Sequence, residues 1–250
     1  MESPRQSPKL DTFLYQNYLD RTPVSLMTKP LMRWHRRLLQ KALELTPIRS
    51  QELRVLEVGP GHGYFAHVCR SYGFDYEFVD ISKVIFDKMT KQGFSGSCKS
   101  LASLTDLPKR YDLVWMSHVL EHSPTWIDAR AMLSEGKKLL SEEGSLVIVS
   151  PDYLSSRKMF FDSDATHGYP TTLRNVVQLA QDTGFTNIDA RFHRGAFFSG
   201  LGRMFSAFAN LIPRQLDRIL SPGRSKTGNG FIYSWKTVYG WRQIFIVLRK

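Results

Sequence analysis

The sequence predicts an α/β fold with a seven-stranded, mostly parallel sheet, helices on both of its faces and a final antiparallel strand. From residue 53 onwards, short apolar runs alternate with segments of helical periodicity, which is typical of parallel sheets covered by helices. A glycine-rich turn follows the first apolar run directly. The chain has 250 residues, 42% of them hydrophobic, which is enough to bury such a core.

The chain divides into four predicted parts. Residues 1–45 are a polar lead-in followed by a helix, and residues 46–194 are the core of the domain. Residues 195–238 interrupt the alternation as a basic, aromatic-rich insertion, and residues 239–250 supply the last strand of the core. The longest apolar runs are only a few residues long, so they suit buried strands and predict no transmembrane helix.

Periodicity and turn residues place the elements in order. Apolar residues at helical intervals predict helices at 25–45, 63–72, 83–91, 125–140 and 172–183. Short apolar runs between turn residues predict strands at 53–58, 76–79, 95–98, 113–116, 146–149, 187–192 and 241–248. The helix at 172–183 has a capping threonine at its start and a glycine stop, Gly184, after its end.

The charge distribution and the cysteines indicate what kind of compartment and partners the protein has. The net charge is +11, and residues 191–250 hold eleven Lys or Arg against one acid, Asp217. Cys69 and Cys98 have no metal-ligand spacing, so both are interpreted as small buried hydrophobes without a disulfide. The first residues lack the apolar segment of a secretory signal, and a cytoplasmic protein is expected.

The segment RVLEVGPGHGYFA at 54–66 has the pattern of a nucleotide-binding turn. An apolar strand leads past Glu57 to glycines at 59, 61 and 63, which allow a tight turn and let a ligand reach main-chain N–H groups. Asp80 ends the next apolar run, where an acid can accept hydrogen bonds from ribose hydroxyls. NAD is the alternative ligand, but the dinucleotide fingerprint needs a glycine where Tyr64 stands.

Three stretches together resemble the class I S-adenosylmethionine-dependent methyltransferases, whose fold is Rossmann-like, in the broad group of small-molecule methyltransferase domains. The stretches are EVGPGHG at 57–63 followed by Asp80, YDLVWMSHVLEH at 111–122, and GSLVIVSP at 144–151. The resemblance covers residues 53 to about 192. It implies S-adenosyl-L-methionine as the cofactor.

The resemblance also implies a cofactor-binding set. In the family, the acid and the glycines of the loop line the methionine part of the cofactor. The acid after the second strand holds the ribose, and the residue after it flanks the adenine. The end of the fourth strand lies nearest the sulfonium. Carried over, these residues are Glu57, Gly59, Pro60, Gly61, His62, Gly63, Asp80, Ile81, Ser117 and His118. The family's usual acid beside adenine is missing, since Ser100 to Ser103 stand there and Asp106 comes late.

Candidate catalytic residues lie in His118-Val-Leu-Glu121-His122, after the fourth predicted strand. The string matches the zinc motif H-x-x-E-H. Ser123-Pro124 follows at once and leaves little helix to fix two imidazoles, so no metal site is predicted. Methyl transfer needs an oriented acceptor and removal of its proton. His118 or His122 is the candidate base, and the alternative is that both only shape the pocket.

His167 is a third catalytic candidate, in DSDATHGYPTT at 162–172. This segment also resembles the family, in which the loop before the helix at 172–183 closes over the acceptor. The resemblance therefore implies that His167 and Tyr169 touch substrate or catalyse. The alternative is that His167 is a solvated or capping histidine of the loop.

Residues 200–220, GLGRMFSAFANLIPRQLDRIL, place large apolar residues at helical spacing with arginines between them. Such a helix can lie at a membrane interface, where apolar burial and attraction to anionic headgroups add, and a peripheral contact at the inner face of the membrane is one expectation. The alternative is that it caps the active site and packs into the core. Arginines dispersed among apolar residues disfavour nucleic acid as a partner.

The leading functional hypothesis is methyl transfer from S-adenosyl-L-methionine to an oxygen of a small-molecule or lipid-linked acceptor. The segment Asp164-x-x-His167 and the insertion suggest an acceptor that is a glycan or quinone-like. A non-catalytic protein that binds the cofactor is the second hypothesis, and an NAD-dependent oxidoreductase is the third. No sequence pattern indicates the oligomeric state.

Overall fold

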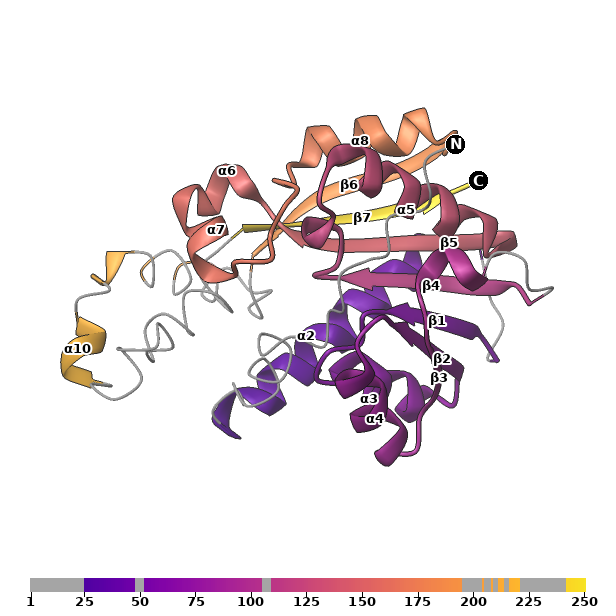
Figure 1. The fold of residues 1–250 in the computed structure, drawn as a ribbon, viewed down its shortest axis with the longest axis horizontal. Helices are drawn as coiled ribbons and strands as arrows, with labels where there is room; N and C mark the ends of the chain where they lie inside the picture. The colour runs from indigo at the N-terminus through magenta and orange to yellow at the C-terminus, as the bar shows by residue number, and fades with distance from the viewer. Residues whose placement is uncertain are drawn as a thin grey trace, which may run out of the picture.

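A computed structural model of the chain describes residues 25–47, 52–104, 109–194, 204, 208, 211–213, 216–220 and 242–250. Its centre is a seven-stranded sheet in the order β3-β2-β1-β4-β5-β7-β6 (Figure 1). β7 pairs antiparallel with β5 and β6, and the other pairs are parallel, which confirms the predicted fold class. The strands are β1 Arg54–Val58, β2 Asp75–Asp80, β3 Ser95–Cys98, β4 Tyr111–Ser117, β5 Leu140–Pro151, β6 Asn187–Arg194 and β7 Arg242–Arg249.

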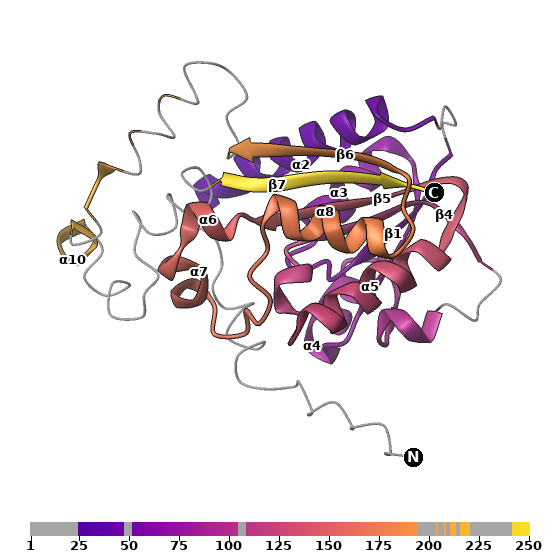
Figure 2. The same cartoon turned by 90° about the horizontal axis from the view of Figure 1, so that it is seen from above.

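Helices cover both faces of the sheet, as Figure 2 shows from above. One face carries α2 (Ser25–Glu44), α3 (Tyr64–Tyr72) and α4 (Lys83–Lys91), and the other carries α5 (Trp126–Lys138) and α8 (Leu173–Asp182). The short helices α6 (Tyr153–Ser156) and α7 (Lys158–Ser163) follow the carboxyl end of β5. The 3₁₀ turns η1 (Leu101–Leu104) and η2 (Leu120–His122) and the helix α10 (Asp217–Leu220) complete the described elements.

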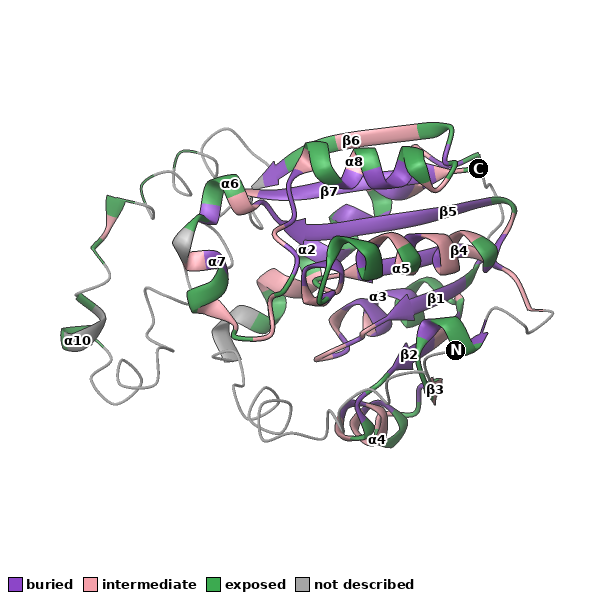
Figure 3. Ribbon diagram, turned by 45° about the horizontal axis from the view of Figure 1, so that its top comes forward, coloured by how far each residue is buried: buried purple, intermediate pink, exposed green. Residues whose placement is uncertain are grey.

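The sheet separates two apolar cores. One packs α2, α3 and α4 on the sheet and includes Leu38, Phe65 and Trp115, with the last two rings stacked at 4.2 Å. The other packs α5 and α8 on the opposite face and includes Leu133 and Val176. The central strands are buried on both sides (Figure 3). Their near-continuous apolar runs follow from that, because no side of the strand faces water.

The structure differs from the sequence prediction at several elements. β4 and β5 are longer than the apolar runs that predicted them, and α6 and α7 were not predicted because they are too short for a periodic pattern. The prediction that both cysteines are buried is wrong for Cys98, which is exposed, whereas Cys69 is buried. The reason is that Cys98 ends β3, the edge strand, whose two terminal residues are exposed.

Most of the predicted insertion at 195–238 lies outside the described residues, including Arg203 and Arg214. Within the described part of that segment, large apolar side chains are exposed to solvent rather than packed in the core: Met204, Phe208, Leu211, Leu216, Ile219 and Leu220. Among the described helices, none is both long enough and apolar enough to cross a bilayer.

Candidate active site

The turn between β1 and α3 depends on its glycines. Gly59, Gly61 and Gly63 all have positive φ, at 68°, 53° and 81°, a region that side chains other than hydrogen disfavour. A Cβ on Gly59 would lie 2.8 Å from Val119 Cγ2, so this position tolerates no side chain. The Gly59 N–H donates to the carbonyl of Val79 at 2.9 Å, which ties the turn to β2. The result is a tight main-chain cradle at the carboxyl edge of the sheet, between β1 and α3.

Two buried carboxyl groups flank this cradle. Glu57 is 3% exposed and accepts a hydrogen bond from the Tyr76 hydroxyl at 2.5 Å. Burial raises the pKa of Glu57 to about 8, against the opposing effect of that hydrogen bond. Asp80 ends β2, and its Oδ1 accepts the Ser82 N–H at 2.7 Å. Burial raises the pKa of Asp80 to about 6, which leaves it ionised at neutral pH.

These groups fit the predicted cofactor. The glycine turn has no Cβ atoms at three of its positions, and Asp80 is held at the end of β2, where an acid can accept hydrogen bonds from ribose hydroxyls. The half-buried His62 lies with Nδ1 3.3 Å from Lys88 Nζ, and burial followed by the Lys88 charge lowers its pKa to about 4. Ile81 is 51% exposed next to Asp80. Asp106 lies outside the described residues.

His118 follows β4 in a strained conformation. Its N–H donates to the carbonyl of Val149 at 2.8 Å, and its φ is +57°, unusual for a residue other than glycine. Its Nδ1 lies 3.1 Å from Oε1 of Glu121, whose side chain has no exposed surface, whereas the His118 side chain is 43% exposed. Burial opposes ionisation of Glu121, but the hydrogen bond from His118 and the nearby histidine charges hold its pKa at about 2. A buried carboxylate therefore orients a partly exposed imidazole.

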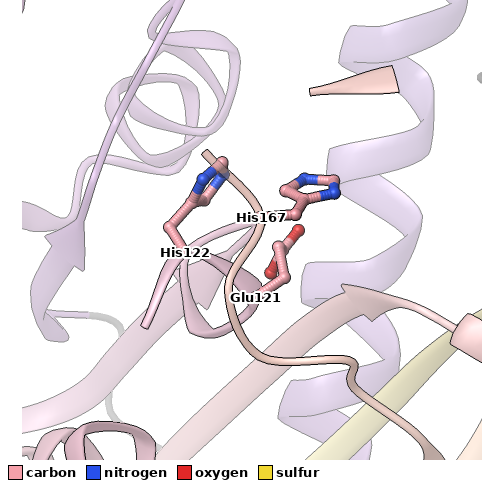
Figure 4. Close-up of side chains that lie close together, drawn as sticks. All are labelled: Glu121, His122 and His167. Carbon is pink, nitrogen blue, oxygen red and sulfur yellow. The ribbon is translucent and has the colours of Figure 1, made fainter. Parts of the chain in front are cut away.

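His122 and His167 meet across two segments. His122 ends η2, His167 lies in the loop between α7 and α8, and their ring centroids are 4.9 Å apart. The main-chain N–H groups of Gly168 and Tyr169 donate to the carbonyl of Glu121 at 2.9 and 3.1 Å, which fixes the loop against η2. Figure 4 shows both imidazoles and the Glu121 carboxylate converging.

The predicted catalytic histidines thus fall into two arrangements around one carboxylate. His118 pairs with Glu121 directly, and His122 and His167 have donor atoms within 4.8 Å of a Glu121 carboxylate oxygen, in reach of one ion. Tyr169, which the resemblance placed at the substrate, is 6% exposed and packs in the core on the α5 and α8 face.

Sequence reasoning named no site residue on α2. Trp34 and His35 are buried, and their Nε1 and Nδ1 atoms have no hydrogen-bond partner among the described residues. The Trp34 ring centroid is 6.3 Å from that of His118, so α2 forms a wall of the site. The helical periodicity placed Trp34 on the buried face, but only the fold shows that this face meets His118.

Comparisons with known proteins identify the family and the fold. The methyltransferase domain family matches residues 31–190. No curated protein matches the chain significantly. A solved S-adenosylmethionine-dependent methyltransferase from Archaeoglobus fulgidus superposes with a TM-score of 0.59 at 22% identity, covering 86% of this chain and 92% of its own.

Two further structures carry the demethylated cofactor. The magnesium protoporphyrin IX methyltransferase from Synechocystis, with bound S-adenosylhomocysteine, has a TM-score of 0.57 at 16% identity, covering 95% of this chain and 96% of its own. The plantazolicin methyltransferase BpumL, also with S-adenosylhomocysteine, has a TM-score of 0.59 at 14% identity over 95% and 89%. At these identities the likeness shows the fold. Because the family match spans more than half of the sequence, this chain belongs to the methyltransferase domain family, as a class I enzyme whose cofactor is S-adenosylmethionine.

Proposed function

We propose that this enzyme methylates a hydroxyl oxygen of a small-molecule or lipid-linked acceptor, with His118 as the base. The observation that carries the proposal is the pairing of His118 with the buried carboxylate of Glu121 beside the glycine turn. S-adenosylmethionine, when bound, supplies an electrophilic methyl group on its sulfonium. The task left to the protein is to orient the acceptor and take its proton.

The state of His118 suits proton removal. An ionised carboxylate can only accept, so Nδ1 of His118 donates to Glu121 and Nε2 carries the lone pair. The imidazole is partly exposed, so an acceptor can reach it. The strained backbone at His118 fits a functional position, because strain of this kind clusters at active sites. Hydroxyl acceptors gain most from such a base, because a neutral hydroxyl is a weak nucleophile until it loses its proton, whereas a neutral amine can attack before it does.

The position of His118 supports the same assignment. Val119, the residue after His118, lies against Gly59. A Cβ added to Gly59 would lie only 2.8 Å from Cγ2 of Val119. The base is therefore one residue from the wall of the cofactor cradle. Glu121 acts as a positioning residue that fixes the tautomer and ring orientation of His118.

The test is a screen for transfer of a radiolabelled methyl group from S-adenosylmethionine to phenolic, glycan, amine and thiol acceptors. We expect transfer to hydroxyl acceptors, with kcat about 10²- to 10⁴-fold lower in His118→Ala and nearly unchanged affinity for S-adenosylhomocysteine. His67→Ala on α3 is the matched control, since His67 bonds Gln92 away from this cluster. Transfer to amines alone, or an unchanged kcat in His118→Ala, contradicts the proposal.

We further propose that the enzyme meets its acceptor at an anionic membrane surface, on the cytoplasmic side. The support is the exposed apolar set in the insertion, which includes Phe208 and Ile219, within a C-terminal region rich in Lys and Arg. Vesicle flotation tests this: co-migration with anionic vesicles at low salt is expected, and it should be lost in a Phe208→Ser, Ile219→Ser double variant. The membrane proposal is contradicted if wild type does not co-migrate with the vesicles, or if the double variant co-migrates as much as wild type does.

A further inference from the structure

We propose that Glu121, His122 and His167 form a binding site for a divalent transition-metal ion. One donor atom from each residue, two imidazole nitrogens and a carboxylate oxygen, lies within 4.8 Å of the others. The three side chains come from two segments and converge on one volume in Figure 4. Two imidazoles with one carboxylate are the ligand set of many zinc and non-haem metal centres.

The hydrogen bonds around His167 leave the nitrogen that a metal needs. Nδ1 of His167 lies 2.6 Å from the carbonyl oxygen of Phe160. A carbonyl only accepts, so Nδ1 carries the proton and Nε2 has the lone pair. Backbone carbonyls hold the second nitrogen of metal-bound histidines in the same manner. The tautomer of His167 is thus set for coordination through Nε2.

A two-step relay sets the same tautomer in His122. The Thr166 hydroxyl donates to Asp164 Oδ1 at 2.7 Å, so its single proton is already used. Thr166 Oγ1 must then accept at its 2.7 Å contact with Nδ1 of His122. His122 therefore carries its proton on Nδ1 and its lone pair on Nε2. Asp164 and Thr166 hold this ligand from outside, as outer-shell groups do in metal sites.

The carboxylate is held as firmly as the imidazoles. Glu121 has no exposed side-chain surface, and its Oε2 accepts the Ser150 hydroxyl at 2.9 Å. Oε1 accepts from His118, and each carboxylate oxygen has a second lone pair for an ion. A buried carboxylate beside the lone-pair nitrogens of two imidazoles is a site that favours a cation.

Gly168 allows this assembly. A Cβ on Gly168 would lie 2.5 Å from the carbonyl oxygen of Ser123 and 3.0 Å from Pro124 Cα, which are backbone atoms that cannot move aside cheaply. The loop carrying His167 can therefore pack on the segment carrying Glu121 and His122 only because this residue is glycine.

The histidines of this site are not the two of the H-x-x-E-H string. In that string the ligands would be His118 and His122, whereas the fold brings His122 together with a histidine 45 positions later.

The ion would occupy a site with an open position. Ligands on one zinc ion at about 2.0–2.2 Å are about 3–3.6 Å apart, so the three side chains must close by about 1 Å on binding. Three protein ligands leave room for an oxygen of a substrate, and coordination lowers the pKa of a bound hydroxyl. This use in activating the acceptor rests on the proposed function, whereas metal binding itself does not.

The test is metal binding by the untagged full chain after treatment with a chelator, without cofactor or acceptor. We titrate Zn²⁺ by calorimetry, titrate Co²⁺ by visible absorption, and measure retained metal by mass spectrometry after dialysis. One equivalent of Zn²⁺ and a d–d spectrum of Co²⁺ bound to nitrogen and oxygen are expected. Affinity for Zn²⁺ should fall at least about 10²-fold in His122→Ala and in His167→Ala, because each variant lacks one ligand of the ion.

His67→Ala is the control that removes a histidine outside the cluster, and Gly168→Ala should weaken binding without removing a ligand. Circular dichroism and S-adenosylhomocysteine binding, measured on every variant, report whether the fold and the cofactor site persist. No stoichiometric metal in wild type, or equal affinity in wild type and in both histidine variants, overturns the site even when cofactor binding is intact. Loss of cofactor binding in wild type would instead contradict the enzyme assignment.

Discussion

Replacement of Asp80 is the sharpest perturbation of the cofactor site. The carboxylate is 7% exposed and is fixed at the end of β2 by the Ser82 N–H. Hydrogen bonds to a charged group contribute about 1.5–3 kcal/mol net, so Asp80→Ala should weaken S-adenosylhomocysteine binding by about 10- to 150-fold. The measurement is a calorimetric titration, with urea unfolding of each variant to report its stability.

Two further variants make the result specific. Asp80→Asn keeps the shape and the acceptor for Ser82 but loses the charge, so its affinity should fall between wild type and Asp80→Ala. Asp75→Ala removes an acid at the opposite end of the same strand, where Asp75 meets Lys109 at 3.7 Å, and should bind as wild type does.

The pH dependence of binding gives an independent check. Because burial raises the pKa of Asp80 to about 6, affinity in wild type should fall as pH drops through this value, and Asp80→Asn should not show this fall. A folded Asp80→Ala that binds within two-fold of wild type would refute the assignment of Asp80 to the ribose. Equally weakened binding of S-adenosylhomocysteine in Asp75→Ala would show that the effect is not specific to Asp80.

Three other predictions concern stability and reactivity. Gly59→Ala should destabilise the protein by about 2–5 kcal/mol, from positive φ and a clash with a valine methyl, and Gly73→Ala by only about 1–2 kcal/mol, since its Cβ meets nothing within 4 Å; equal losses in urea unfolding would contradict the clash. Burial raises the pKa of Glu57 from 4.5 to about 8, so the free energy of unfolding should fall by up to about 5 kcal/mol as pH rises through this window, and a similar slope in Glu57→Gln would argue against it. A thiol reagent should modify Cys98 in the native protein and Cys69 only after unfolding.

The fold and the glycine turn could be predicted because their signals are local. Strands buried on both faces appear as continuous apolar runs, and the glycine turn occupies seven consecutive residues from Glu57 to Gly63. Strand ends were less well predicted. β5 begins at Leu140 and passes through Glu142 and Glu143, whose exposed side chains break the apolar run.

The histidine cluster could be predicted only as separate candidates. His118, His122 and His167 were each identified, but no spacing shows that they gather around Glu121, because that depends on main-chain hydrogen bonds between residues 47 and 48 positions apart. The structure has only a single 3₁₀ turn, η2, at the H-x-x-E-H string, so little helix is present to hold both of its histidines. A short helix excludes one pairing of histidines and says nothing about a partner supplied by another loop.

The two halves of the site therefore have different structural origins. The cofactor cradle is built by one strand-turn-helix unit, so it forms wherever that unit folds. The acceptor side that we propose requires the loop from Asp164 to Tyr169 to pack on η2, which Gly168 makes possible and the carbonyl of Glu121 holds in place. A change in that loop should alter acceptor binding while leaving cofactor affinity nearly unchanged, because the two halves share no backbone segment except the end of β4.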